Sequence, residues 1–213
     1  MHNRILLGLL VPVHVMLSQS VTHELPFAST NNSLELSIEN TATIQANTVK
    51  IKAQNVPVWL KFTSTEQTIG QLEGKQERAA MFTFSIEKSA PVKTKQTLSF
   101  QITTSDGQTW SKDITISVNP PDRFELFQNY PNPFNPSTTI SYQLTTDAKV
   151  SLKIYDLLGR EVAALVDEDK PAGYHEVRWN ALTYSSGMYI YQIVYNDRQG
   201  HREFHRKTML LVK

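Results

Sequence analysis

The sequence predicts an all-β protein with two immunoglobulin-like or fibronectin-like β-sandwich domains in tandem. Three observations predict it. Short segments of alternating apolar and polar residues follow one another along the 213 residues, glycine and asparagine–proline turn signals separate them, and no run with a helical period interrupts them. Because successive side chains of a strand point to opposite faces, period two indicates strands with one buried face, and two series of such strands indicate two sandwiches.

Residues 1–20 have the pattern of a cleaved secretory signal peptide. Arg4 gives a short basic beginning, residues 5–17 are mostly apolar, and residues 18–20 (Ser-Gln-Ser) offer the small side chains that a signal peptidase reads. The alternative is a membrane anchor, but the apolar segment is shorter than the ~20 residues that span a bilayer, and Pro12 and His14 weaken it further. We therefore expect cleavage after Ser20 and export of the remaining chain through the periplasm.

Residues 21–119 are expected to form the first Ig-like sandwich. Five alternating apolar sets mark its predicted strands: Leu34, Leu36 and Ile38; Val49 and Ile51; Ala80, Phe82, Phe84 and Ile86; Leu98, Phe100 and Ile102; and Ile114, Ile116 and Val118. A segment around residues 58–62 is expected to add another strand. Asp106 and Gly107 are expected to form a hairpin turn, since glycine tolerates the positive φ of such turns. Gly70 and Gly74 are interpreted as further turn signals.

Composition narrows the classes of function. The formal net charge of +1 provides no electrostatic case for binding nucleic acid or an anionic membrane. The sequence contains no cysteine, so disulfides, thiolate metal sites and a cysteine nucleophile are excluded. It also contains no phosphate-binding loop or nucleotide signature.

Several groups of residues resemble catalytic or metal sites but have simpler explanations. His201 and His205 have a metal-ligand spacing for a helix, but on the strand expected here four residues span ~13 Å. Residues 167–169 (Asp-Glu-Asp), expected in a loop, lack the spaced ligands of a calcium loop. Asp156 and His175 occur without a Gly-x-Ser-x-Gly nucleophile elbow. We therefore expect no catalytic residue, no metal site, no cofactor and no enzymatic activity.

The aromatic residues leave one binding function open. Trp179 falls in a strand pattern of the second domain and is expected in the core, as most large aromatics of a sandwich are. Trp110 follows the hairpin at Gly107 and is the better candidate for a surface aromatic on which a sugar could stack. Carbohydrate or other ligand binding by the first domain is therefore the alternative function.

Residues 120–137 are interpreted as a linker and domain entrance rich in proline and asparagine. Proline fixes φ and lacks an amide hydrogen, so Pro131, Pro133 and Pro136 cannot continue a central strand, and each residue before a proline is pushed toward extended geometry. We therefore expect a stiff, extended connector that delivers the chain into a strand over residues 139–144.

The second sandwich is expected over residues 138–213. Val150, Leu152 and Ile154 share one strand face, and residues 188–195 are apolar on both faces, which is usual for a strand that is central or covered by a neighbour. Further strands are expected over residues 161–166, around residues 175–179 and over residues 203–212. The turns between them are marked by glycines: Gly159, Gly173, Gly187 and Gly200.

Residues 124–213 resemble the C-terminal sorting domains of type IX (Por) secretion substrates, which are related to the Ig-like part of flagellar hook-capping proteins. The resemblance rests on motif pieces that occur in family order: the run Gln128 to Ile140, residues 150–156, 159–162 and 172–175, Trp179, residues 186–189 and residues 207–213. The residues assigned to the sorting signal are Asn129, Tyr130, Pro131, Asn132, Pro133, Phe134, Asn135, Pro136, Gly159, Gly173, Gly187, Lys207 and Lys213.

This resemblance implies a destination and no reaction. It implies docking of the folded domain on an outer-membrane translocon, cleavage by a sortase in the linker near residues 119–125, and attachment to a surface glycolipid. The last strand, residues 207–213, is the implied recognition surface. The expected product is a cell-surface or extracellular protein that carries a small structural or adhesion module.

Overall fold

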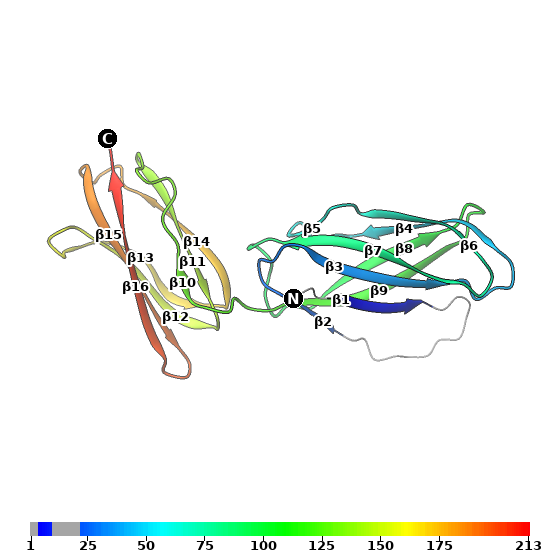
Figure 1. Cartoon of the computed structure of the whole chain (residues 1–213). Helices are drawn as coiled ribbons and strands as arrows, with labels where there is room; N and C mark the ends of the chain where they lie inside the picture. Colours follow the sequence, from blue (N-terminus) through cyan, green and yellow to red (C-terminus); the bar gives the residue numbers. More distant parts are fainter. Residues whose placement is uncertain (1–3, 10–21) are drawn as a thin grey trace. The chain divides into compact units, whose positions relative to one another are not determined.

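The computed structural model describes residues 4–9 and 22–213, with side chains from residue 22 onward (Figure 1). The described residues contain only strands, turns and loops, which confirms the all-β prediction, and they include no helix that could cross a membrane. The chain divides into two compact units, Met1–Asn119 and Pro120–Lys213. The predicted signal peptide lies outside the described residues except for residues 4–9, whose backbone forms strand β1.

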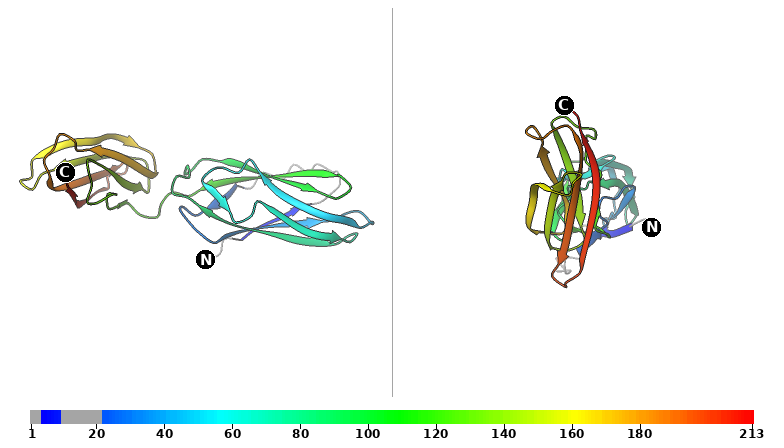
Figure 2. Two further views of the ribbon diagram at one scale, coloured as in Figure 1. Left: turned by 90° about the horizontal axis from the view of Figure 1, so that it is seen from above. Right: turned by 90° about the vertical axis from the view of Figure 1, so that its left-hand side faces the viewer.

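The N-terminal unit is a sandwich of two sheets (Figures 1 and 2). The four-stranded sheet consists, in spatial order, of β1 (Arg4–Leu9), β3 (Asn32–Glu39), β7 (Glu77–Ile86) and β5 (Leu60–Phe62). The five-stranded sheet consists of β2 (Thr22–Leu25), β9 (Thr109–Val118), β8 (Gln96–Thr103), β4 (Ala46–Gln54) and β6 (Glu66–Leu72). Pairing is antiparallel except at two edges, where β1 runs parallel to β3 and β2 runs parallel to β9.

The core of this unit confirms the five alternating sets. Every residue of these sets is buried, and the polar residues between them lie on the outer faces. Phe82 of one sheet and Phe100 of the other are fully buried with ring centroids 5.2 Å apart, so the two inner faces interdigitate at the centre. Burial of this apolar area is the main contribution that holds the two sheets together.

Two features of the first sheet pair differ from the sequence prediction. β2 and β6 are strands that the alternation did not reveal. Gly70, expected in a turn, lies within β6 with φ +67°, beside two register shifts in the pairing of β6 with β4. The prediction of a turn there was wrong because the glycine accommodates a bulge inside a strand rather than a chain reversal.

The C-terminal unit is a second, smaller sandwich. Its three-stranded sheet consists of β10 (Glu125–Leu126), β11 (Ser137–Leu144) and β14 (Gly173–Asn180). Its four-stranded sheet consists of β13 (Glu161–Lys170), β12 (Ala148–Tyr155), β15 (Gly187–Asp197) and β16 (Arg202–Leu211). All pairs are antiparallel. The core is aromatic-rich, with Tyr142, Tyr191 and Tyr195 among the largest fully buried side chains.

The acidic run at residues 167–169 corrects a second expectation. It was placed in a loop, but β13 continues to Lys170, and Asp167 and Glu168 stand opposite Ser151 and Val150 of β12. The extra length is stabilised by pairing with β12 and by ion pairs, Lys149 Nζ to Asp167 Oδ1 at 3.1 Å and Lys170 Nζ to Glu168 Oε1 at 2.6 Å. The carboxylates are therefore partnered on a solvated strand.

Candidate recognition surface around the last strand

The asparagine–proline motif is part of the C-terminal fold and is not a free connector. Phe134 forms an isolated parallel bridge to Leu211 at the end of β16. The Phe134 N–H donates to the Leu210 carbonyl at 3.0 Å, and the Val212 N–H donates to the Phe134 carbonyl at 3.0 Å. The prediction of a stiff linker through residue 137 is corrected here, because backbone bonds join the motif to the last strand about 80 residues further along the chain.

Two side-chain amides extend this contact along β16. Gln128 Nε2 donates to the Thr208 carbonyl at 2.8 Å, and the Leu210 N–H donates to Asn132 Oδ1 at 2.9 Å. Together with the Phe134 bridge, they satisfy backbone groups on the edge of β16 that would otherwise face water. The end of the last strand is therefore held from the side by the motif.

A buried asparagine organises the motif itself. Asn129 is 2 % exposed, and its Nδ2 donates to the Pro131 carbonyl at 3.0 Å and to Thr138 Oγ1 at 2.9 Å. Its backbone N–H donates to the hydroxyl of Tyr191 at 2.9 Å, and that hydroxyl donates to the Phe127 carbonyl at 2.9 Å. Burial raises the pKa of Tyr191 to about 12, so the phenol stays protonated and keeps this donor–acceptor role.

Phe134 anchors the motif in the hydrophobic core. Its ring is 2 % exposed and lies 5.5 Å from Trp179, centroid to centroid, at an interplanar angle of 52°. Trp179 in turn contacts Tyr184 and Tyr189, each with centroids 5.4 Å away. The prediction that Trp179 is a core residue is confirmed.

The motif residues between these anchors face solvent. Tyr130 is 82 % exposed, and four further members are exposed: Pro131, Asn132, Pro133 and Asn135. The peptide bonds before Pro131 and Pro133 are cis. The motif therefore presents polar, aromatic and proline side chains on a loop whose buried asparagine and phenylalanine hold it in place.

The structure brings only some of the predicted sorting residues together. Gly187 begins β15 opposite Leu211, and Lys213 donates its N–H to Ser186 Oγ and its ammonium group to the Leu182 carbonyl, at 3.1 and 2.7 Å. Gly159 lies in the turn between β12 and β13. Gly173 stands opposite Leu144, at the end of β11 remote from the motif.

Lys207 also lies on the last strand. It is half-buried and pairs in register with Tyr191. The sorting-signal residues thus divide into a cluster around the end of β16, which includes Lys207, and two turn glycines outside that cluster.

An exposed apolar face beside the motif was missed. Residues 188, 190 and 194 were recognised as a second apolar face of β15, and the strand was expected to be central or covered by a neighbour. β15 does lie inside its sheet, between β12 and β16, but Met188 is 48 % exposed. It stands opposite the exposed Leu210, and Phe204, 57 % exposed, stands opposite Val194. The alternation of apolar residues on both strands was the available signal.

The residues weighed as catalytic make local structural contacts. Asp156 Oδ1 accepts the N–H groups of Leu158 and Arg160 at 2.9 and 3.0 Å, so it caps the turn at Gly159. His175 stacks on Tyr142 and bonds the Pro171 carbonyl at 2.8 Å, and burial lowers its pKa. Within the part of the chain that the structure describes, no three His, Asp or Glu side chains converge as metal ligands.

Comparisons with solved structures found similar chains of low sequence identity. The chain is similar to the CupB2 chaperone of Pseudomonas aeruginosa, with 12 % identity, coverage of 89 % of this chain and 98 % of that one, and a TM-score of 0.30. It is similar to dimeric latent PorU of Porphyromonas gingivalis, with 18 % identity over 77 % of this chain but only 16 % of PorU, at a TM-score of 0.36. TM-scores this low do not support conclusions about function. A comparison with curated proteins found no significant match.

The family comparison is specific to the C-terminal unit. Residues 128–204 match the family of the secretion system C-terminal sorting domain. The match begins at Gln128, the first motif side chain that bonds β16, and it includes Asn129, Phe134 and most of the four-stranded sheet. Residues 128–204 of this chain are therefore a C-terminal sorting domain of the type IX secretion family.

Proposed function

We propose that this chain is an exported, non-enzymatic protein whose C-terminal unit is its address for type IX secretion and whose N-terminal unit is the delivered module. The family match implies interaction with the type IX machinery and a destination at the outer membrane or cell surface. Docking on the translocon, removal by a sortase near residues 119–125 and attachment to a surface glycolipid belong to this proposal.

The observation that carries the proposal is the way the motif holds the last strand. Gln128, Asn132 and Phe134 fix the end of β16. The exposed Met188 of β15 and Leu210 of β16 lie opposite each other on the outer face of this strand pair. Large apolar side chains exposed next to each other are a feature of interaction sites. The surface proposed for recognition is therefore the motif loop together with this apolar face.

The experiment is localisation in the native cell, with a matched pair of variants. Met188 lies on the proposed surface and is 48 % exposed. Met81 of β7, in the N-terminal unit, is 44 % exposed and serves as the matched control. We expect Met188→Asp to leave protein in the periplasm and Met81→Asp to be exported like the unmodified chain. Both changes add a charge at a solvated position, so neither should unfold its unit.

A truncation after Asn119 supplies the second arm of the experiment. The N-terminal unit has its own hydrophobic core, and the truncation leaves that core intact. Full-length protein at the surface and truncated protein in the periplasm would support the address function. Arrival of both at the same place would contradict it and would make the C-terminal unit a structural or binding module.

A further inference from the structure

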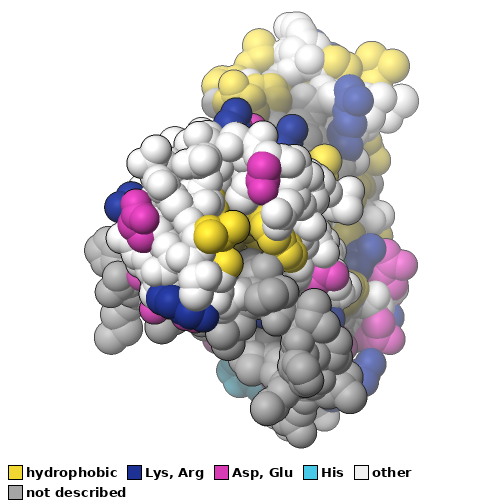
Figure 3. Space-filling view, turned by 90° about the vertical axis from the view of Figure 1, so that its right-hand side faces the viewer, with side chains coloured by type: hydrophobic (Ala, Val, Ile, Leu, Met, Phe, Trp, Pro, Cys, Tyr) yellow, Lys and Arg dark blue, Asp and Glu magenta, His cyan; other side chains and the backbone are white. Residues whose placement is uncertain are grey.

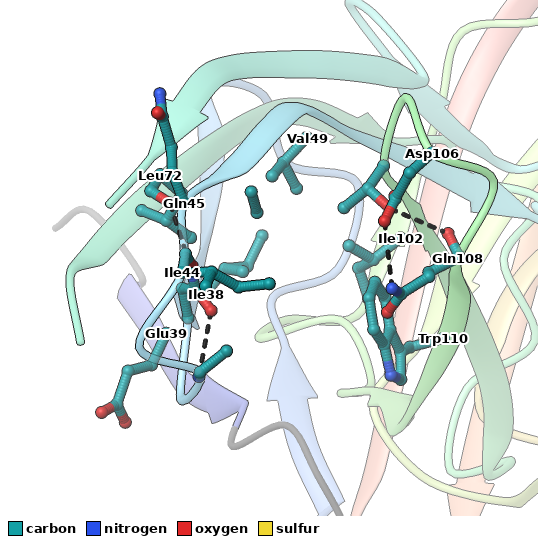
Figure 4. A pocket seen from close by; sticks show the side chains of 14 residues that line it. Ile38, Glu39, Ile44, Gln45, Val49, Leu72, Ile102, Asp106, Gln108 and Trp110 are labelled. Carbon is teal, nitrogen blue, oxygen red and sulfur yellow. Dashed lines mark hydrogen bonds between the residues drawn. The ribbon is translucent and has the colours of Figure 1, made fainter. Parts of the chain in front are cut away.

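One end of the N-terminal sandwich is open to solvent and contains a pocket of about 220 Å³ (Figure 4). Its floor is made of core residues at the ends of four strands: Ile38 of β3, Val49 of β4, Leu72 of β6 and Ile102 of β8. The loop after β3 and the hairpin between β8 and β9 form its two sides. Figure 3 views this end of the unit and shows hydrophobic side chains in the middle of a mostly polar face.

One wall of the pocket is aromatic. Trp110, at the start of β9, stands opposite Ile102 in the strand pairing and is half-buried. The sequence predicted it as a surface aromatic; in the structure it lines this pocket at the end of the core. Ile44, 75 % exposed, lies on the loop at the opposite side of the mouth. The cavity is thus bounded by apolar groups on its floor and on both sides.

The polar groups at the rim include amides and a hydroxyl as well as carboxylates, and several of these donors already bond the protein: Asn40 Nδ2 donates to the Ile44 and Leu72 carbonyls. Asp106 accepts hydrogen bonds from the Thr104 hydroxyl and from Gln108 Nε2, the latter at 3.0 Å, and the hydrogen bond from Thr104 helps to hold the pKa of Asp106 below its usual value. Glu39 also lines the pocket, but its carboxylate points away from the cavity (Figure 4). No Lys or Arg is among the described residues that line the pocket. Lys75, at the same end of the unit, donates its ammonium group to the Thr41 carbonyl.

We propose that this pocket binds a small molecule with one apolar ring or branched aliphatic body and a hydrogen-bond-donating end that is neutral or cationic. The volume suits one ring, since an engineered apolar cavity of about 150 Å³ holds benzene. The Asp106 carboxylate at the rim attracts a donor or a positive charge and repels an anion. This inference concerns the N-terminal unit alone and does not depend on the proposed secretion function.

A sugar is the competing occupant, and the floor argues against it. A pyranose inserted into the pocket would place hydroxyl groups against four aliphatic side chains that offer no hydrogen bond. Burying an unpaired hydroxyl costs about 1–3 kcal/mol. Trp110 could stack on one sugar face, but the remaining hydroxyls would stay unpaired. A compact ring with a single polar end can pack against the aliphatic floor and form a hydrogen bond at the rim.

The test titrates the full-length protein with benzylamine, benzyl alcohol, benzoate and methyl glucoside, and follows the methyl NMR signals of Ile38 and Ile102. We expect saturable shifts with benzylamine and benzyl alcohol, and binding of benzoate on the order of tenfold weaker than that of benzylamine. Asp106→Asn should reduce the preference for benzylamine over benzoate while leaving benzyl alcohol binding unchanged. Ala46→Phe, which fills the pocket from its edge, should abolish all three.

Two controls and one set of contrary results decide whether the pocket binds as proposed. Val58→Phe, at an exposed position that does not line the pocket, is the control for Ala46→Phe and should bind as the unmodified chain does. If Ala46→Phe disturbs folding, the Asp106→Asn charge preference still decides the question, because that side chain is exposed. Absence of saturable shifts with both benzylamine and benzyl alcohol, or tighter binding of methyl glucoside than of benzyl alcohol, would overturn the proposal.

Discussion

Replacing Asn129 with alanine measures whether the motif is a structural part of the C-terminal unit. The substitution removes the two hydrogen bonds that Nδ2 donates to the Pro131 carbonyl and Thr138 Oγ1, and the one that Oδ1 accepts from Gln128 at 2.8 Å. The Pro131 carbonyl still accepts from the Thr138 hydroxyl, and the exposed Gln128 can bond water.

The expected loss of stability follows from the hydrogen bonds that the substitution removes. Two buried bonds at about 1 kcal/mol each, plus the space left by the amide, predict that the unfolding free energy of the C-terminal unit falls by about 2–3 kcal/mol. Asn135→Ala is the matched control because Asn135 is an exposed asparagine of the same motif. Its effect should stay within about 0.5 kcal/mol.

The assay is urea unfolding of the full-length protein, followed separately for each unit. Methyl NMR signals of Ile140 and Ile193 report on the C-terminal core, and those of Ile51 and Ile116 report on the N-terminal core. Asn129→Ala should lower the urea midpoint of the first pair only. A midpoint unchanged from that of Asn135→Ala would refute the reasoning and would favour the original prediction of a stiff, extended connector.

Three further predictions address the same unit. Phe134→Ala should lower its unfolding free energy by about 3–5 kcal/mol in the same urea assay, because it leaves a cavity against Trp179; a loss below 1 kcal/mol would contradict this. Between about pH 10 and 12 stability should fall, because unfolded chains ionise Tyr191 near 10 while the folded chain retains the proton to about 12. Urea midpoints at pH 9 to 12 would test it, and Tyr191→Phe should reduce the fall without abolishing it, because burial also raises the pKa of Tyr142 to about 12. Gly159→Ala should cost about 1–2 kcal/mol through its φ of +78° alone, since a Cβ there meets no atom within 4 Å; an unchanged midpoint would exclude strain.

The strands of both cores could be predicted because their signal is local. Phe82, Phe100 and Leu152 each belong to a separate set of apolar residues that recurs at period two within a few positions, and each set is buried as expected. β2 escaped prediction because its four residues, with one buried apolar side chain, are too short to show alternation. Gly70 was misassigned because a bulge and a turn use the same residue type.

The candidate recognition surface could be predicted only in part, because its bonds are not local. Gln128 and Asn132 bond Thr208 and Leu210, which lie 80 and 78 positions away, and no pattern in the sequence encodes such a pairing. The motif was recognised by its residue types, but its proline content predicted an extended linker. What the prolines exclude is regular strand pairing, and the isolated bridges at Tyr130 and Phe134 are compatible with that exclusion.

Because the motif holds β16 in place, substitutions in the proposed address fall into two kinds: those of buried residues that hold the loop and those of exposed residues on its surface. Asn129 and Phe134 are buried and hold the loop against the last strand, so altering them loosens the folded surface without changing its exposed side chains. Met188 and Leu210 project outward from paired strands, so altering them changes the surface while leaving the fold. If a machinery reads the folded domain, both kinds of change block export; if it reads an extended terminal peptide, Asn129→Ala should be exported normally. Comparing export of Asn129→Ala with that of Met188→Asp therefore determines whether the address is a folded surface or a linear segment.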